Sequence, residues 1–183
     1  LKRAGNIEGI APGETIYSVR FMGERLYMVT FKKVDPFFVI DVADPANPKI
    51  LGKLKIPGYS DYLHPFDANH IIGFGKEAVD PSDLEKEGFN SGSFDFAWYQ
   101  GMKVAMFDVT DVSNPVEMFK VQIGDRGTDS PLLHDHKALL FDKDKGIMAF
   151  PVTLAEISAA AKEEAVGNTY GDYTFQGAYI YNV

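Results

Sequence analysis

Residues 38–48, with the sequence FVIDVADPANP, decide the fold of this chain, because the same phrase returns at residues 105–115 as AMFDVTDVSNP. Residues 178–183, AYIYNV, have the pattern of the opening of a third copy. Each full copy combines an apolar strand, an Asp-Val pair and an Asp-rich turn that ends in Asn-Pro before the next strand. Repetition of one unit along a chain predicts a repeat architecture in which similar units stack on one another.

An apolar hairpin precedes each copy of the phrase. Two short apolar runs separated by a turn occupy residues 16–31, and the same arrangement recurs in residues 62–75 and residues 137–152. Such runs, separated by Gly, Asp or Asn, are typical of β-hairpins. After the Asn-Pro, residues 53–56 (KLKI) and residues 120–123 (KVQI) alternate between polar and apolar side chains, as a strand with one wet face does. The repeating unit is therefore predicted to be a four-stranded antiparallel sheet.

Four-stranded antiparallel units in tandem are the blades of a β-propeller, so we predict an all-β fold with about three blades' worth of strands and a short inserted helix. Residues 153–156 (TLAE) have the pattern of a capping box, and Gly167 is expected to end the inserted helix. The predicted parts of this β-propeller fragment (1–183) are the outer strand of a preceding blade (1–8), a blade (14–57), a blade with an insertion at 76–100 (60–124), and an incomplete blade with a helical insertion at 153–171 (134–183).

Several motifs resemble those of a known group of propellers. The Asp-Val-x-Asp-x-x-Asn-Pro turn resembles the LVIVD-type propeller repeat. Residues 17–21 (YSVRF), 57–65 (PGYSDYLHP) and 123–127 (IGDRG) are similar to segments of a secreted prokaryotic β-propeller-domain family distantly related to WD-repeat proteins. The resemblance spans nearly the whole chain. It implies a secreted or cell-surface, extracytoplasmic location, and it brings no established activity and no catalytic residues.

The number of predicted strands has a consequence for assembly. Propellers contain roughly four to eight blades, so three blades' worth of strands does not close a ring. An open sheet edge exposes backbone donors and acceptors that pair with other strands. We therefore expect two copies to form a homodimer that closes a six-bladed ring, in which each N-terminal strand completes the last blade of the other copy.

The composition of the chain restricts its partners. The formal net charge of −8 over 183 residues argues against nucleic acid, because phosphate binding needs clustered Lys and Arg. No apolar stretch approaches the roughly 18 residues of a transmembrane helix, so direct membrane insertion is not expected. The chain has no cysteine, which excludes disulfide bonds and thiolate chemistry.

Aromatic and arginine side chains supply the candidate binding residues. Trp98 and Tyr99 end an aromatic stretch in the insertion of the second blade, and Arg20, His64 and Arg126 lie near the ends of predicted strands. Aromatic and Arg side chains dominate the energetics of many interfaces. The leading hypothesis is a non-enzymatic extracytoplasmic interaction module that binds a protein or glycan partner and needs no cofactor. The alternatives are that the rings cover their own blade and that the arginines pair with nearby acids.

His134, Asp135 and His136 form the densest cluster of potential metal ligands. Alternate histidines on an extended chain point the same way, and two imidazoles with a carboxylate can hold Zn²⁺ or another transition metal. With His64 at the same axial channel, they support a second hypothesis, a metal-dependent hydrolase or lyase. The alternatives are that these histidines bond to neighbouring turns and that the chain has a purely architectural role.

The repeated Asp41 and Asp108 are better explained by turns than by a metal. Asp and Asn side chains cap their own turns, and Asn-Pro fixes the backbone that enters the next strand. The matching position in the third copy is Asn182, whose amide caps a turn about as well as a carboxylate but is a poorer metal ligand. Residues 142–146 (DKDKG) are likewise predicted to be a hairpin turn rather than a calcium loop, because two lysines lie inside the segment.

Overall fold

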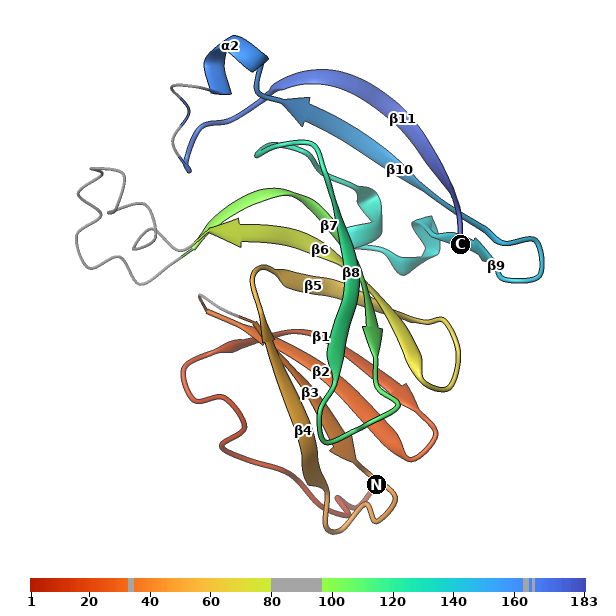
Figure 1. The fold of residues 1–183 in the computed structure, drawn as a ribbon. Helices are drawn as coiled ribbons and strands as arrows, with labels where there is room; N and C mark the ends of the chain where they lie inside the picture. Colours follow the sequence, from red (N-terminus) through yellow and green to blue (C-terminus); the bar gives the residue numbers. More distant parts are fainter. Residues whose placement is uncertain (33–34, 80–96, 163–164, 166) are drawn as a thin grey trace.

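Three antiparallel sheets follow one another along the chain in the computed structural model, which describes residues 1–32, 35–79, 97–162, 165 and 167–183 (Figure 1). The first sheet contains β1 (Thr15–Met22), β2 (Arg25–Phe31), β3 (Asp35–Asp41) and β4 (Lys49–Ile56). The second contains β5 (Tyr59–Pro65), β6 (His70–Val79), β7 (Trp98–Asp108) and β8 (Val116–Ile123). The third contains β9 (Leu140–Asp142), β10 (Ile147–Glu156) and β11 (Asp172–Asn182). The predicted all-β fold built from four-stranded antiparallel units is confirmed, with three strands described in the last unit.

The described helices are short. The two 3₁₀ turns are η2 (Pro131–Leu133) and η3 (His136–Ala138), and the α-helix is α2 (Ala159–Lys162). In the part of the chain that the structure describes, no helix has the length and hydropathy needed to cross a lipid bilayer.

The backbone pairing shows that the repeated phrase marks equivalent positions in the three sheets. The third strand of each sheet ends with the acid or amide of the phrase opposite the first residue of the second strand. The pairs are Asp41 with Arg25, Asp108 with His70, and Asn182 with Ile147. A register shift between the third and fourth strands also recurs, between Val39 and Ile40 and between Met106 and Phe107. The repeated units therefore share their strand register and the position of this register shift, as well as their residue types.

The Asp-rich turns have the capping geometry expected from the sequence. The Oδ1 atom of Asp41 accepts a hydrogen bond from the backbone N–H of Ala43 at 2.9 Å, and Asp108 accepts one from Thr110 at 2.8 Å. Hydrogen bonds from the side chain and backbone of Thr110 hold the pKa of Asp108 below its usual value. The interpretation of these acids as turn caps is confirmed.

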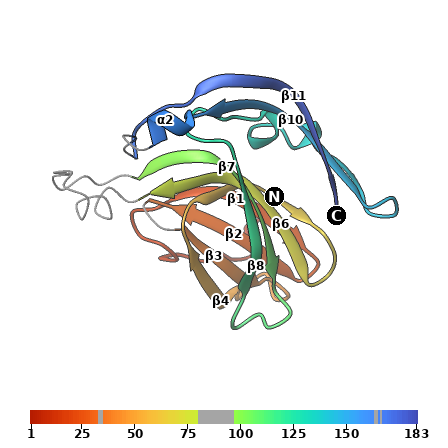
Figure 2. The same ribbon diagram turned by 45° about the horizontal axis from the view of Figure 1, so that its top comes forward.

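Apolar side chains on both faces of the second sheet join it to its neighbours. Phe37 of β3 and Phe107 of β7 are both fully buried, and their rings stack with centroids 4.7 Å apart. Phe74 of β6 meets Phe150 of β10 edge to face at 5.7 Å. Gly52 of β4 lies so close to the next sheet that a Cβ atom would approach the carbonyl oxygen of Val112 to 2.2 Å. The sheets therefore pack face to face, and Figure 2 shows this stacking from a second direction.

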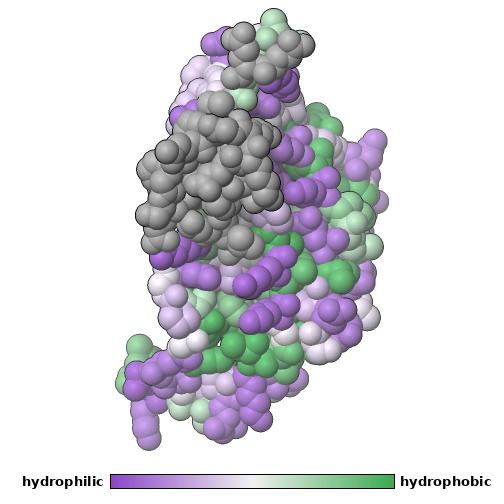
Figure 3. Space-filling model, turned by 60° about the vertical axis from the view of Figure 1, so that its left-hand side comes forward, coloured by the Kyte–Doolittle hydropathy of each residue, from purple (hydrophilic) through white to green (hydrophobic). Residues whose placement is uncertain are grey.

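Along the outer strand of the first sheet, buried and exposed side chains alternate, as expected for a strand with one face in solvent. Leu54 and Ile56 of β4 are more buried than Lys53 and Lys55 between them. Figure 3 shows apolar and polar side chains interleaved on one side of the molecule. On β8, however, Phe119 remains 60% exposed.

The boundaries of both insertions differ from those predicted. β6 continues to Val79 and β7 begins at Trp98, so parts of the segment 76–100 are strand; residues 80–96 lie outside the described residues. In the segment 153–171, residues 153–156 (TLAE) belong to β10 and not to a helix N-terminus, because they pair with β11. The helix α2 has four residues and is capped by Ser158, whose hydroxyl accepts a hydrogen bond from Ala161 N–H at 3.2 Å. Strand pairing has overridden the local capping pattern.

The strand predicted to begin at residue 137 is shorter than expected. The first strand expected from residue 137 is limited to the three residues of β9, because Asp135 caps the 3₁₀ turn η3 through the N–H of Lys137 at 3.0 Å. Residues 1–8 pair with no strand among the described residues, and their assignment as the outer strand of a preceding blade stays a prediction. Ile7, with Ile10, packs against a cluster on the first sheet that includes the buried Phe38.

We predict that Asp41→Ala lowers the free energy of unfolding by about 0.5–1.5 kcal/mol, because the N–H of Ala43 loses its acceptor. Asp41→Asn keeps a side-chain oxygen in place and is expected to retain most of the stability. Urea denaturation, with and without EDTA, measures both. A large effect of EDTA on the unmodified chain would contradict the turn-cap role and favour a metal.

Candidate functional site

Aromatic rings from all three sheets gather at one end of the molecule. Antiparallel strands place the starts of β1, β5 and β7 and the ends of β2 and β8 at the same end. Tyr170, just before β11, lies at this end too. We call this set the aromatic end cluster, and its members are Tyr17, Phe31, Tyr59, Tyr99, Arg126 and Tyr170.

The rings of this cluster contact one another across the boundary between the first two sheets. The ring centroid of Tyr59 lies 4.4 Å from that of Tyr17 and 5.0 Å from that of Tyr99. The hydroxyl groups of Tyr17 and Tyr99 are hydrogen-bonded at 3.0 Å. Tyr59 is buried, and burial followed by the charge of Asp61 raises the pKa of its hydroxyl. Tyr99 is 39% exposed and presents the cluster to solvent.

Arg126 connects the second sheet to the third. One guanidinium nitrogen, Nη1, donates to the carbonyl of Tyr99 at 3.2 Å, and Nη2 donates to the hydroxyl of Tyr170 at 3.3 Å. The guanidinium carbon also lies 4.5 Å from the ring centroid of Tyr170, in cation–π geometry. Tyr170 is 67% exposed, so this arginine supports an exposed ring.

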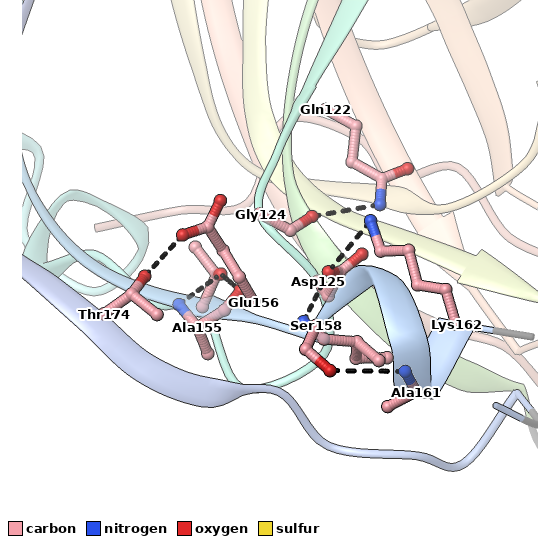
Figure 4. A network of polar contacts seen from close by, with 11 residues as sticks. Gln122, Gly124, Asp125, Ala155, Glu156, Ser158, Ala161, Lys162 and Thr174 are labelled. Atoms are coloured by element: carbon pink, nitrogen blue, oxygen red, sulfur yellow. Dashed lines mark hydrogen bonds and ion pairs between the residues drawn. The ribbon is translucent and has the colours of Figure 1, made fainter. Parts of the chain in front are cut away.

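The segment that carries Arg126 is held by a polar network with the end of β10 and with α2 (Figure 4). Asp125 donates its N–H to the carbonyl of Ala155 at 2.8 Å, and its carboxylate accepts from Ile157 N–H at 2.8 Å. Lys162 of α2 pairs with the same carboxylate at 3.3 Å. Gly124 and Gly127 have φ values of 63° and 107°, a backbone region that other residues rarely adopt. The IGDRG segment therefore positions Arg126 through its backbone.

A lysine and two acids lie beside the aromatic end cluster. Lys76 pairs with Asp129 at 3.0 Å and donates to the carbonyl of Thr128. Asp61 is the extra residue at a register shift between β5 and β6. Burial raises the pKa of Asp61 to about 7; Asp129 adds to this, whereas Lys76 opposes it.

The second group of candidate residues lies on the inner strands of the sheets, where β1 and β5 run side by side. We call it the inner-edge cluster, and its members are Arg20, Tyr62, His64, His136 and Phe141. The Nη2 atom of Arg20 donates to the hydroxyl of Tyr62 at 2.9 Å, and this hydroxyl lies 2.9 Å from Nδ1 of His64. Because Arg only donates, the Tyr62 oxygen accepts from it, and the hydrogen of this hydroxyl is available for donation to Nδ1.

This arrangement favours a neutral His64. Burial, followed by the positive charge of Arg20, lowers the pKa of His64. Its Nδ1 atom is an acceptor already used by Tyr62, which leaves Nε2 as a donor. Arg20 also donates from Nε to the carbonyl of Leu63 at 2.8 Å, so the arginine joins β1 to β5.

The structure changes the interpretation of the predicted metal ligands. His134 and His136 do not alternate on an extended strand, because η2 and η3 coil this segment and Asp135 caps the second turn. The ring of His136 stacks on the ring of Tyr62, with their two centroids 5.9 Å apart. Among the residues that the structure describes, no group of three His, Asp or Glu side chains is arranged to hold a metal ion.

The predicted binding residues divide between these clusters. Tyr99 and Arg126 lie in the aromatic end cluster, and Arg20 and His64 lie in the inner-edge cluster. Trp98 is only 8% exposed, so its ring is a packing element and not a surface contact. Sequence reasoning missed Tyr17 and Tyr59, although a Tyr-Ser pair opens the first strand of both full sheets and was a usable signal.

Comparison with known proteins agrees with this architecture. The beta propeller domain family model matches residues 1–183. The chain belongs to this family. An uncharacterized protein of Methanocaldococcus jannaschii is 39% identical over 151 residues, and one of Archaeoglobus fulgidus is 37% identical over 151 residues. Each alignment covers 82% of this chain and 21% of the relative, so the propeller chain spans about a fifth of the length of these relatives. No solved structure matches it.

The titration of Asp61 predicts a pH dependence of the propeller's stability. Its folded-state pKa of about 7 lies above the ordinary value of 3.8, so its stabilising contribution is complete below the ordinary value and is lost as the pH rises through 7. We expect Asp61→Asn to become progressively more stable than the unmodified chain as the pH rises from about 4 to about 8. Urea denaturation across this range measures the difference, and a pH-independent difference would contradict the raised pKa.

A second prediction concerns the inner-edge cluster. Arg20→Met removes the neighbouring positive charge, so we expect the pKa of His64 to rise. NMR titration of the imidazole C–H signals measures this pKa directly. The matched control is Arg3→Met, which removes an exposed arginine outside the cluster and should leave His64 unchanged. An unchanged or lower pKa in Arg20→Met would show that Arg20 does not control the charge of this histidine.

Proposed function

We propose that this propeller is a non-enzymatic interaction module that binds a protein or glycan partner through the aromatic end cluster. The observation that supports it is the bridge from Tyr99 through Arg126 to Tyr170. It presents two exposed tyrosines and a guanidinium in fixed positions.

The chemistry of the cluster suits recognition. Tyrosine offers a large rigid face together with a hydroxyl, and little conformational entropy is lost when it is held at an interface. Tyr99 is already held by the hydroxyl of Tyr17, and Tyr170 is held by Arg126, so the rings are ordered before a partner arrives. Preorganisation of this kind increases affinity by lowering the entropy loss on binding.

An extracytoplasmic location, secreted or on the cell surface, is part of the same proposal. It is supported by the resemblance of residues 17–21, 57–65 and 123–127 to secreted prokaryotic propellers, and by the likeness of the Asp-Val-x-Asp-x-x-Asn-Pro turn to LVIVD-type repeats. The metal-dependent hydrolase or lyase at the axial channel has less support. His64 uses Nδ1 for Tyr62, and His134 is exposed in a separate turn.

We predict that Tyr170→Ala weakens binding of a partner by about tenfold or more, since contributions above roughly 2 kcal/mol are typical of central aromatic residues. The probes are arrays of neutral and acidic oligosaccharides and a set of purified cell-surface proteins, with affinities measured from the fluorescence of the single tryptophan, Trp98. Phe21→Ala is the matched control, because Phe21 has the same 67% exposure but lies at the opposite end of β1. Failure of every probe to bind, or equal loss in both variants, would contradict the proposal.

A further inference from the structure

A polar cleft opens between the hairpin turns of the first two sheets. The β1–β2 turn forms one wall with Met22, Glu24 and Arg25, and the β5–β6 turn forms the other wall with Asn69. Figure 1 shows these two turns next to each other on the right-hand side of the molecule. The cleft has a volume of about 820 Å³, within the range of about 300–1,000 Å³ that is typical of small-ligand sites. Because β1 runs from the aromatic end cluster to Met22, the cleft lies at the opposite end of this strand.

Tyr27 borders the inner part of this cleft and carries a hydroxyl group without a partner. Its side chain is fully buried in the core between the first two sheets, and its ring stacks on Phe37 with centroids 5.9 Å apart. The buried hydroxyl has no hydrogen-bond partner among the described residues. Buried polar groups are nearly always hydrogen-bonded, because desolvation without a partner costs free energy. At the equivalent positions the next two sheets have Ile72 and Ala149, whose apolar side chains need no such partner.

Arg25 supplies a second polar group that is free to bind a ligand. Because side chains alternate along a strand, Arg25 and Tyr27 project from the same face of β2, toward the second sheet. Asp41 lies opposite Arg25 in the strand pair, but its carboxylate caps the N–H of Ala43. Arg25 forms no hydrogen bond or ion pair with any residue that the structure describes. The N–H donors of its guanidinium group therefore remain available in the cleft.

The backbone of both turns is fixed by the same repeated hydrogen bond. The carbonyl of Glu24 accepts from the N–H of Val42 at 2.9 Å, and the carbonyl of Asn69 accepts from the N–H of Val109 at 2.8 Å. The N–H of Asn69 also donates to the carboxylate of Asp67 at 2.8 Å. These bonds use only backbone groups of Glu24 and Asn69. Their side chains are therefore held at the rim of the cleft with their own polar atoms uncommitted.

A side chain of the protein occupies the corresponding position at the next boundary. Lys143, in the β9–β10 turn, donates to the carbonyl of Phe66 at 3.0 Å and lies 4.4 Å from the centroid of its ring. The same ammonium group lies 3.9 Å from the carboxylate of Asp67. At the first boundary, the β5–β6 turn contributes the short side chains of Ala68 and Asn69. The first boundary therefore has an open cleft where the second holds a lysine.

We propose that this cleft is a binding site for a neutral saccharide unit. A sugar hydroxyl both donates and accepts, so neighbouring hydroxyls can bond at once to the guanidinium of Arg25 and to the carboxylate of Glu24. An anionic ligand meets the like charge of Glu24 and a cationic ligand meets that of Arg25, so this pair of opposite charges favours an uncharged ligand. The hydroxyl of Tyr27 and the amide of Asn69 add further donors and acceptors, and Met22 offers an apolar contact. This site is separate from the aromatic end cluster and does not depend on the partner proposed there.

The direct test is isothermal titration calorimetry of the intact chain with glucose, galactose, mannose, N-acetylglucosamine and lactose. We expect saturable binding of at least one of these neutral sugars. The corresponding uronic acid and amino sugar, which bring a charge into the cleft, should bind about tenfold more weakly. No binding of any neutral sugar up to roughly 50 mM, or equal or tighter binding of the charged sugars, would overturn the proposal.

Variants of the cleft separate a ligand role from a structural one. Tyr27→Phe removes a hydroxyl that bonds to no described residue, so we expect equal or higher stability in urea together with about fivefold weaker sugar binding. Arg25→Met should weaken the sugar about tenfold. The controls are Arg3→Met, an exposed arginine outside the cleft, and Tyr170→Ala in the aromatic end cluster, and neither should change the affinity. Lost affinity in Tyr170→Ala would assign the sugar to the aromatic end cluster, and unchanged affinity in both cleft variants would place it elsewhere; each result contradicts the proposed site.

Discussion

Face-to-face packing of consecutive sheets is the interaction on which the rest of this propeller depends. A sheet with apolar side chains on both faces cannot bury them alone, so each unit is stabilised by its neighbours. Phe37 and Phe107 illustrate this, because both are fully buried and their rings stack across the boundary between two sheets. Complete burial of one such side chain contributes on the order of 1.5–3 kcal/mol, so a boundary with many of them outweighs any single polar contact. At Gly52 the backbones of two neighbouring units lie so close that there is no room for a Cβ atom.

The faces of the sheets form the apolar core. Polar side chains that can bind a partner are therefore found at the strand ends and on the inner strands. This explains why the candidate residues divide into two clusters. Arg126 leaves the end of one sheet and supports a ring of the next, and Arg20 joins neighbouring inner strands in the same way. Both arginines therefore donate hydrogen bonds across a boundary between neighbouring sheets.

Local sequence patterns failed where long-range pairing opposed them. Residues 153–156 have a capping-box pattern, but each of these residues has a partner in β11, and several strand hydrogen bonds outweigh one cap. His134 and His136 were expected on an extended strand, whereas His134 ends the 3₁₀ turn η2 and His136 begins the next one, η3, which Asp135 caps. The complete burial of Lys103, whose ammonium group donates to the carbonyl of Pro57 at 2.7 Å, could not be read from its polar character.

The sequence by itself determined the repeating unit, its antiparallel order and the Asp-rich turns, because these depend on contacts between residues close along the chain. Asp41 needs only Ala43 to form its cap. The tertiary structure alone decided which distant side chains meet. Tyr17 and Tyr99 share a hydrogen bond across 82 positions of sequence, and no local pattern encodes that distance. Their meeting follows from the angle and register at which one sheet packs on the next, which is set by the summed fit of many apolar side chains.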